Sequence, residues 1–501
     1  MSMHSTKRRA LIARVLLGMF AIAITGGCAV GPDFVKPTAP AVKNYTAEPL
    51  PAQIGSTESG QSQTLAVGRD IPGQWWTLFH SAALNQLVEQ ALKSNFDLAA
   101  AQATLLQVRE TVLAQEGTLL PAIDAKAGVS RQRTSSASFG GAGFGGSIYT
   151  LYNPAVTVSY TFGFSTQREL ESLAAQEDYQ RFQLEGAYLS LTANVVVAAV
   201  QEASLRAQIA ATEKIVEAQT KQLNIMQRQL DLGAIAKADA LLQQAQTAQT
   251  RAALPILQKQ LAQKRDQLSV LTGQFPNTEL EAKFELADFQ LPSELPLTLP
   301  SALVEQRPDV RAQEAALHQA NAQIGIATAN LLPQFGITGS YGVVSNKANG
   351  LFSASNIIWS MGASALQPLF HGGQLRHARR AAIAAHDASA AQYRSVVLKA
   401  FADVADTLRA LEFDAMALDA QKDAEQSAAT SLELAQKQLH AGAINSLTLL
   451  NAERTYQQTH INYIQAQAGR YADTTALFQA LGGGWWNRQD VTSGAATSHP
   501  N

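Results

Sequence analysis

Few residues in this 501-residue chain combine the types and spacing that catalysis or cofactor binding requires. The run GAGFGG at 141–146 fits the G-x-G-x-x-G pattern with which dinucleotide-binding proteins approach a pyrophosphate. It lies between two predicted strands and opens no helix, so no helix N-terminus would face a phosphate. His371 and His377 offer imidazoles, but histidines six residues apart share no helical face and no carboxylate joins them. We therefore predict a protein that is not an enzyme and that holds no cofactor and no metal ion.

Cys28 is the one cysteine of the chain, which excludes an intramolecular disulfide and a cysteine-based zinc site. It follows a basic stretch at 7–9, an apolar run at 15–24 and three small residues, which is the order of an export signal. The apolar run is too short to cross a bilayer of ~30 Å as a helix. The alternative interpretation is a buried structural cysteine.

This N-terminus resembles a bacterial lipoprotein signal, which implies removal of residues 1–27 and acylation of Cys28. Ala29 stands where such proteins carry Asp when they are retained in the inner membrane, so the resemblance favours the outer membrane. Two or more acyl chains would give stable anchoring, at ~0.8 kcal/mol per buried CH₂.

Composition narrows the function classes further. The net charge of −2 gives no reason to expect a nucleic-acid partner, and 46% hydrophobic with 16% charged residues excludes a disordered chain. No apolar run after Cys28 reaches the ~18 residues of a transmembrane helix, so we expect none.

The chain repeats one unit of roughly 210 residues. Four positions match at a shift of 212 residues: Asp97, Ala103, Leu105 and Pro121 against Asp309, Ala315, Leu317 and Pro333. The spacing from Gly233 to Gly273 equals that from Gly442 to Gly482. We predict a signal peptide (1–27), a lipidated extended segment (28–72), two repeats (73–290 and 291–484) and a C-terminal tail (485–501).

Each repeat is predicted to contain a helix, two strands, one very long helix and a return helix. Apolar and small polar residues alternate in four strands, at ~121–132, ~153–164, ~333–344 and ~357–368. A membrane barrel requires this alternation, and Tyr160, Tyr341 and Trp359 would face lipid in its aromatic girdles. A half-buried soluble sheet alternates in the same way, so the strands alone favour neither.

The helices favour the membrane interpretation. Proline is absent from 166–232 and 374–441, so each predicts a helix of ~100 Å, and return helices follow at ~234–272 and ~443–481. A first helix at ~298–331 opens the second repeat. The 4-3 spacing of residues along 205–230 is typical of a coiled-coil seam. An ordinary helical bundle does not explain strands of membrane type between such helices.

Four strands cannot close a barrel, and open sheet edges are not tolerated in lipid. A homotrimer would supply twelve strands. We therefore predict an α+β membrane protein, in which a trimeric 12-stranded β-barrel with four strands per protomer continues into a long α-helical coiled-coil tunnel.

The sequence resembles the outer-membrane efflux proteins, the TolC-like family, and in particular its NodT and OprM-like lipoprotein branch. The matching stretches run nearly end to end: CAVGPDFVKP at 28–37, WWTLFHSAALNQLVEQAL at 75–92, RPDVRAQEAAL at 307–317 and QPLFHGGQL at 367–375. The stretch SYTFGFSTQ at 159–167 departs from the turn that relatives carry there. The resemblance implies a homotrimeric duct through the outer membrane and periplasm. It also implies a periplasmic adaptor protein and an inner-membrane pump of the resistance-nodulation-division type as partners.

Two turns are predicted to form the periplasmic tip and contact the adaptor, at Gly233 with Ala234 and at Gly442 with Ala443. A glycine at each position can take the left-handed conformation that ends a helix and reverses the chain. We call them the tip turns.

The resemblance also implies a gate beside the tip. Relatives carry one or two aspartates at the start of the return helix, and this chain has the uncharged Thr448 and Asn451 there. Asp239 stands at the equivalent position of the first repeat, where it either faces the pore or stabilises the helix start. These three residues are the gate candidates.

We expect the exit duct of a tripartite efflux system that conducts drugs or other small toxic compounds. The alternative is the outer-membrane duct of a type I protein secretion system. A passive porin would not need long periplasmic coiled coils, and an enzyme would need a site that the sequence lacks.

Overall fold

The computed structural model describes residues 30–55, 62–133, 148–278 and 280–488, so Cys28 and the predicted signal peptide lie outside the described part. The chain forms two compact units. The sheet unit comprises residues up to 36 with 105–179 and 313–393, and the helical unit comprises 37–104, 180–312 and 394 onwards.

Both repeats run in the order helices, strands, long helix, return helix, and the first repeat has two more strands than the second. The first contains α2 (Ala82–Ser94), α3 (Phe96–Glu116), β3 (Ala122–Lys126), β4 (Val129–Arg133), β5 (Ile148–Tyr152), β6 (Ala155–Phe162), α4 (Thr166–Asp231) and α5 (Lys237–Leu271). The second contains α6 (Pro300–Gln306), α7 (Pro308–Ala329), β8 (Gln334–Val343), β9 (Ile357–Leu366), α8 (Gln374–His440) and α9 (Ser446–Ala480). The helices α4 and α8 have 66 and 67 residues, and α5 and α9 have 35 each.

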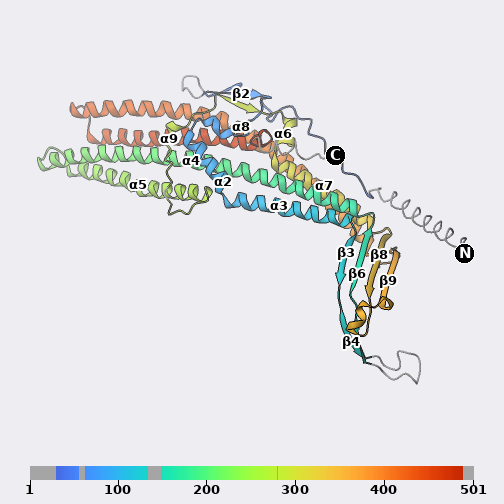
Figure 1. The fold of residues 1–501 in the computed structure, drawn as a ribbon. Coiled ribbons are helices and arrows are strands. Elements are labelled where there is room, and N and C mark those ends of the chain that lie inside the picture. Colours follow the sequence, from blue (N-terminus) through green and yellow to red (C-terminus); the bar gives the residue numbers. More distant parts are fainter. Residues whose placement is uncertain (1–29, 56–61, 134–147, 279, 489–501) are drawn as a thin grey trace, which may run out of the picture. The chain divides into compact units, whose positions relative to one another are not determined.

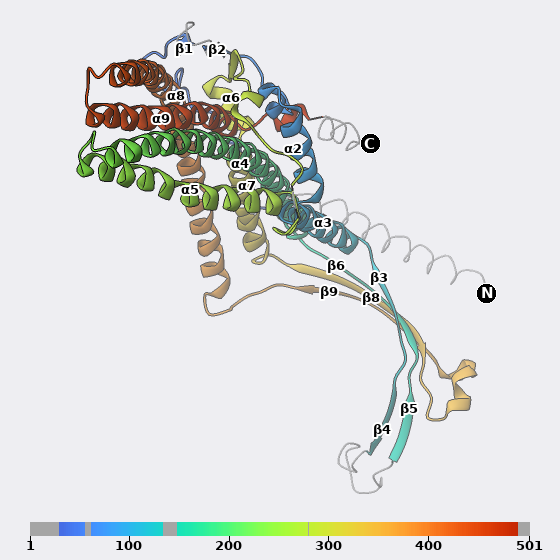
Figure 2. The ribbon, with the colours of Figure 1, turned by 90° about the vertical axis from the view of Figure 1, so that its left-hand side faces the viewer.

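The sheet unit contains a four-stranded antiparallel sheet in the order β3-β6-β8-β9, with β3 and β9 at its edges (Figures 1 and 2). The register places one apolar set on one face: Val156, Val158 and Tyr160 of β6 opposite Tyr341, Gly339 and Ile337 of β8. The other face carries Thr157, Ser159 and Thr161 opposite Ser340, Thr338 and Gly336. Because side chains alternate across a strand, one face of the sheet is apolar and the other is polar.

Two of the strands differ from the sequence prediction, because each is interrupted. The stretch 121–132 forms β3 and β4, and a further strand, β5, precedes the expected start of β6 and pairs with β4. The break lies where Asn153 donates its backbone N–H to Gly128 O (2.9 Å) and Pro154 follows without an N–H. A Cβ on Gly128 would overlap Asn153 Oδ1, so a larger residue there would require the Asn153 side chain to move.

The first helix of each repeat is also divided, which the sequence analysis did not predict. Arg307 separates α6 from α7 in an extended conformation (ψ 124°), because the residue before Pro308 is disfavoured in a helix. Asn95 takes the same conformation (ψ 127°) between α2 and α3.

In the helical unit, α4, α5, α8 and α9 run side by side, and the two tip turns lie at the same end (Figures 1 and 2). Thr212, Gln219 and Met226, seven residues apart along the predicted seam, are buried. One window of α4 is long and apolar enough to cross a membrane by composition, and 56% of it is buried inside the protein. Its buried Val195, Val196 and Ala199 indicate that this stretch belongs to the protein core.

Segments outside the helices complete the helical unit. The strands β1 (Gln53–Ile54), β2 (Gln63–Val67) and β7 (Glu294–Leu297) form a three-stranded sheet in that order, so the predicted extended segment 28–72 contributes two strands. An aromatic core packs beside it, in which Trp75 stacks on Phe478 with ring centroids 5.3 Å apart. The predicted tail at 485–501 begins with an ordered residue, since Trp485 Nε1 donates to Gln306 O (2.7 Å).

Candidate functional site

The two tip turns have the same hydrogen-bonded geometry. After α4, Gly233 N–H donates to Leu230 O (2.9 Å) and Ala234 N–H donates to Gln229 O (2.8 Å). After α8, Gly442 N–H donates to Leu439 O and Ala443 N–H donates to Gln438 O, both at 2.9 Å. This pair of bonds is the Schellman motif, in which a left-handed residue ends the helix. Gly233 (φ 68°) and Gly442 (φ 72°) supply that conformation.

Both turns are exposed surface. Nothing lies within 4 Å of the position that a Cβ would take on Gly233 or Gly442. A larger residue is therefore opposed by the left-handed backbone and not by crowding within one chain. Leu232, beside the first turn, is 83% exposed. An apolar side chain this exposed is available for contact with another chain.

The gate candidates lie in the first two turns of the return helices. Asp239 is the acidic residue in the first turn of α5 and is half-buried. In α9, Asn445 is the N-cap and accepts from Thr448 N–H (3.0 Å) and from Thr448 Oγ1 (2.9 Å). Asn451 is exposed one turn further along. The turn of α9 that carries Thr448 therefore has a fixed start without any carboxylate.

A buried polar layer among α4, α5 and α9 was missed by the sequence analysis. Glu453 of α9 is 7% exposed and faces the amides of Gln243 (α5) and Gln219 (α4), which are also buried. Burial raises the pKa of Glu453, and the two amides partly offset that effect. The 4-3 pattern placed Gln219 in the seam, but no spacing signal distinguishes Glu453 from the exposed glutamates of the same helices.

The aromatic residues predicted to face lipid lie at two heights along the strands, which we call the two aromatic levels. Tyr341 pairs directly with Trp359, and their side chains are 59% and 74% exposed. Tyr160 belongs to the other level, where it stacks on Phe162, whose ring in turn stacks on Phe335 (both centroid distances 5.5 Å). Phe335 and Tyr341 are six positions apart in β8, or ~20 Å at the rise of a strand, and Tyr160 is opposite Ile337 between them. The level at Phe162 and Phe335 is at the end where the strands join the helices.

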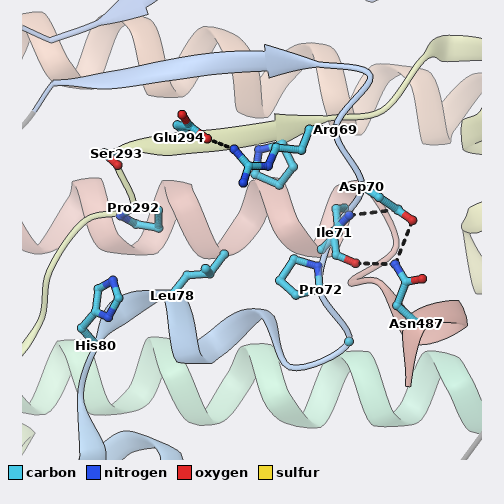
Figure 3. A pocket seen from close by; sticks show the side chains of 12 residues that line it. Arg69, Asp70, Ile71, Pro72, Leu78, His80, Pro292, Ser293, Glu294 and Asn487 are labelled. Carbon is cyan, nitrogen blue, oxygen red and sulfur yellow. Dashed lines mark hydrogen bonds and ion pairs between the residues drawn. The ribbon is translucent and has the colours of Figure 1, made fainter. Parts of the chain in front are cut away.

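The helical unit contains a hollow of about 560 Å³ that is lined by charged and polar side chains (Figure 3). Three of its charged groups have partners: Arg69 pairs with Glu294, and Asp70 accepts from the amide Asn487 Nδ2 (2.9 Å). Ser293 and His80 both line it, and no hydrogen bond joins them, so it holds no paired nucleophile and base. Across the described ranges, no three histidine, cysteine or acidic side chains gather to hold a metal.

The pattern of one protein family, the outer membrane efflux proteins, matches residues 87–274 and 299–483. The chain belongs to the outer membrane efflux protein family. The two matched stretches follow the two repeats, and the family predicted from the sequence is confirmed. This family comprises channels and is not a class of enzymes.

Named relatives of this family member are efflux proteins. The chain is 29% identical over 454 residues to the pyoverdine export outer membrane protein OpmQ of Pseudomonas aeruginosa, covering 87% of this chain and 93% of that protein. It is also 29% identical over 474 residues to the toluene efflux pump outer membrane protein TtgC of Pseudomonas putida, covering 93% and 94%. The solved outer-membrane channel OprN shares its fold with a TM-score of 0.81 at 27% identity, over 91% of this chain and 100% of that chain.

These findings confirm three predictions. The protein is an outer membrane efflux channel, it is located in the bacterial outer membrane and extends into the periplasm, and its helix-rich α/β fold is that of the TolC-like channels.

Proposed function

We propose that three copies of this chain form the exit duct of a tripartite efflux system. The observation that carries the proposal is the four-stranded sheet with one apolar face, two aromatic levels and two open edges. Edges of this kind cannot remain open in lipid. Three copies joined edge to edge give a closed barrel of twelve strands, and the ~20 Å between the aromatic levels approaches the ~25 Å apolar band of such barrels.

The tip turns contact a periplasmic adaptor, which connects the channel to an inner-membrane pump of the resistance-nodulation-division type. The two turns present the same Schellman geometry at the same end of the helical unit, so one adaptor motif can contact both. Cys28 carries the lipid that anchors the chain in the outer membrane. Asp239, Thr448 and Asn451 surround the closed entrance.

The cargo is a small toxic compound selected by the pump. Relatives with nearly equal identity to this chain are named for pyoverdine and for toluene, so likeness among these channels does not specify the cargo. No cofactor is required, because conduction through a duct breaks no covalent bond.

Deletion of the gene tests this function. The deletion strain should become several-fold more susceptible to part of a panel of antibiotics, dyes and solvents, and the wild-type gene should restore resistance. An unchanged susceptibility across the panel, with loss of secretion of a protein instead, would favour a type I secretion duct.

A further inference from the structure

The described chain begins with an extended segment, residues 30–36, which binds the start of α4 in the sheet unit. We call this segment the strap. Arg168, the third residue of α4, is 3% exposed and makes three contacts with it. Its Nε donates to Val30 O (3.0 Å), and its second guanidinium nitrogen contacts Gly31 O (3.4 Å) and Asp33 Oδ1 (2.7 Å). The remaining nitrogen donates to Glu171 (2.5 Å), so the whole guanidinium is occupied. An extended segment without secondary structure is thereby held at fixed points.

The same strap is bound by α7 of the second repeat. Asn321 Nδ2 donates to Pro32 O (2.9 Å), and the Phe34 ring stacks on His318 with centroids 4.3 Å apart. Glu171 Oε1 of α4 accepts from His318 Nε2 at 2.9 Å, which links the two helices under the strap.

The backbone of the strap lies directly against α7. A Cβ on Gly31 would come within 2.6 Å of Gly325 Cα, and a Cβ on Gly325 would come within 2.6 Å of Arg168 Cγ. Real side chains do not tolerate these distances, and Gly31 also has a positive φ of 97°. The contact therefore requires glycine at both positions, because only residues without a Cβ let the two backbones approach this closely.

We propose that the strap is a latch that joins the two repeats and fixes the position of the lipid anchor. The proposal rests on acylation of Cys28. Only Ala29 separates Cys28 from Val30, and two residues reach at most ~7 Å. Arg168 follows Phe162, the last residue of β6, by six positions. The acyl chains therefore enter the membrane beside the end of the sheet, at the level of the Phe162 and Phe335 rings, and set the depth of the barrel. Arg168 is the positioning residue.

Chymotrypsin cleavage after Phe34 tests the latch, because Phe34 must leave His318 before a protease can bind it. The membrane-embedded Arg168→Met protein should be cut about tenfold faster than wild type or more, since charge-assisted bonds are lost. Asp33→Ala removes a side chain that is 91% exposed and should accelerate cleavage less, and the double variant should equal Arg168→Met. Lys221→Met, an exposed cation of the same helix, is the control. Cleavage of Arg168→Met at the wild-type rate would overturn the latch.

Insertions test whether the latch fixes the anchor. About ten Gly-Ser residues between Ala29 and Val30 add roughly 20 Å of reach and leave the latch intact. We expect this insertion to lower drug resistance several-fold, and the same insertion after Thr38 to have no effect. Equal resistance in the two strains would overturn the positioning role. Radioactive palmitate should label every variant; an unlabelled wild-type protein would refute acylation of Cys28 but not the latch, because cleavage after Phe34 does not depend on the label.

Discussion

Asn95 and Arg307 occupy the same position of the two repeats, and each places its side chain on the end of its own return helix. Asn95 Nδ2 donates to Leu271 O, the last residue of α5, and Arg307 donates from its guanidinium to Ala480 O, the last residue of α9, both at 3.1 Å. Helix ends leave carbonyls without partners, and these side chains satisfy one in each repeat.

The two residues differ in how the first turn of the helix that follows each of them is capped. Asn95 Oδ1 also accepts from Leu98 N–H (3.0 Å) and so caps α3. The guanidinium of Arg307 has no atom that can accept a hydrogen bond, so Asp309 accepts from Val310 N–H in its place. Asp309 also forms an ion pair with Arg307 at 2.7 Å. The two contacts that Asn95 makes alone are thus divided between Arg307 and Asp309 in the second repeat.

Arg307→Met should destabilise the protein more than Asn95→Ala. The guanidinium also contacts Ala400 O and pairs with Asp403, so its removal leaves the Ala480 carbonyl without a donor and Asp403 without its partner, at about 2–4 kcal/mol. Asn95→Ala loses one bond and a cap, at about 1–2 kcal/mol. The midpoint of heat unfolding in detergent, followed by tryptophan fluorescence, ranks the variants, with Lys221→Met as the control. Equal midpoints, or a lower midpoint for Asn95→Ala, would contradict the roles assigned to Arg307 and Asn95 between their helices.

Gly442→Trp should abolish efflux while the protein still assembles. The left-handed backbone opposes any residue with a Cβ by about 1–2 kcal/mol, and the indole obstructs contact with the adaptor. Gly68→Trp is the matched control, since Gly68 has a φ of 81°, open space around it and no place in the tip turns. Antibiotic susceptibility measures the effect. Full resistance with Gly442→Trp would exclude the turn after α8 as an adaptor contact.

Asn451→Asp should strengthen the block of conductance by divalent cations. Three carboxylates on a symmetry axis attract such cations, which amides do weakly. The wild-type channel in planar bilayers should be blocked only weakly from the periplasmic side. Asn44→Asp adds the same charge at an exposed position of the N-terminal segment and should change nothing. A strong block in wild type that Asn451→Asp leaves unaltered would refute this gate.

Stability should fall as pH rises through neutrality, because of Asp473 in α9. The pKa of Asp473 is raised to about 7, first by burial and then by a hydrogen bond with Asp414 and the negative charge of Asp414. The positive charge of Arg470 opposes this shift. The folded protein thus binds this proton more tightly than the unfolded chain, so the contribution is present at low pH and lost as pH rises through about 7. The unfolding midpoint should fall between about pH 5 and about pH 8, and Asp473→Asn should flatten this slope. The exposed Asp231→Asn is the control, and an unchanged slope in Asp473→Asn would contradict the assignment.

The sequence predicted those features that local backbone chemistry determines. Gly233 and Gly442 end helices because only glycine takes the left-handed conformation cheaply, and the absence of proline from α4 and α8 predicted their length. The alternation in β6 and β8 predicted which face is apolar.

The features that were missed depend on partners distant in the sequence. Arg307 breaks a helix where Pro308 signals it, but its contacts with Ala480 and Asp403 follow from tertiary packing. Arg168 is one of many arginines in the sequence, and only the fold brings residues 30–36 to it. Glu453 carries no local sign of burial.

The number of chains in the purified channel tests the central claim most directly. Native mass spectrometry of the protein extracted from outer membranes should give the mass of three mature acylated chains, each beginning at Cys28, because three sheets of four strands close a barrel of twelve. A complex of one, two or four chains that still conducts in planar bilayers would contradict the trimeric duct.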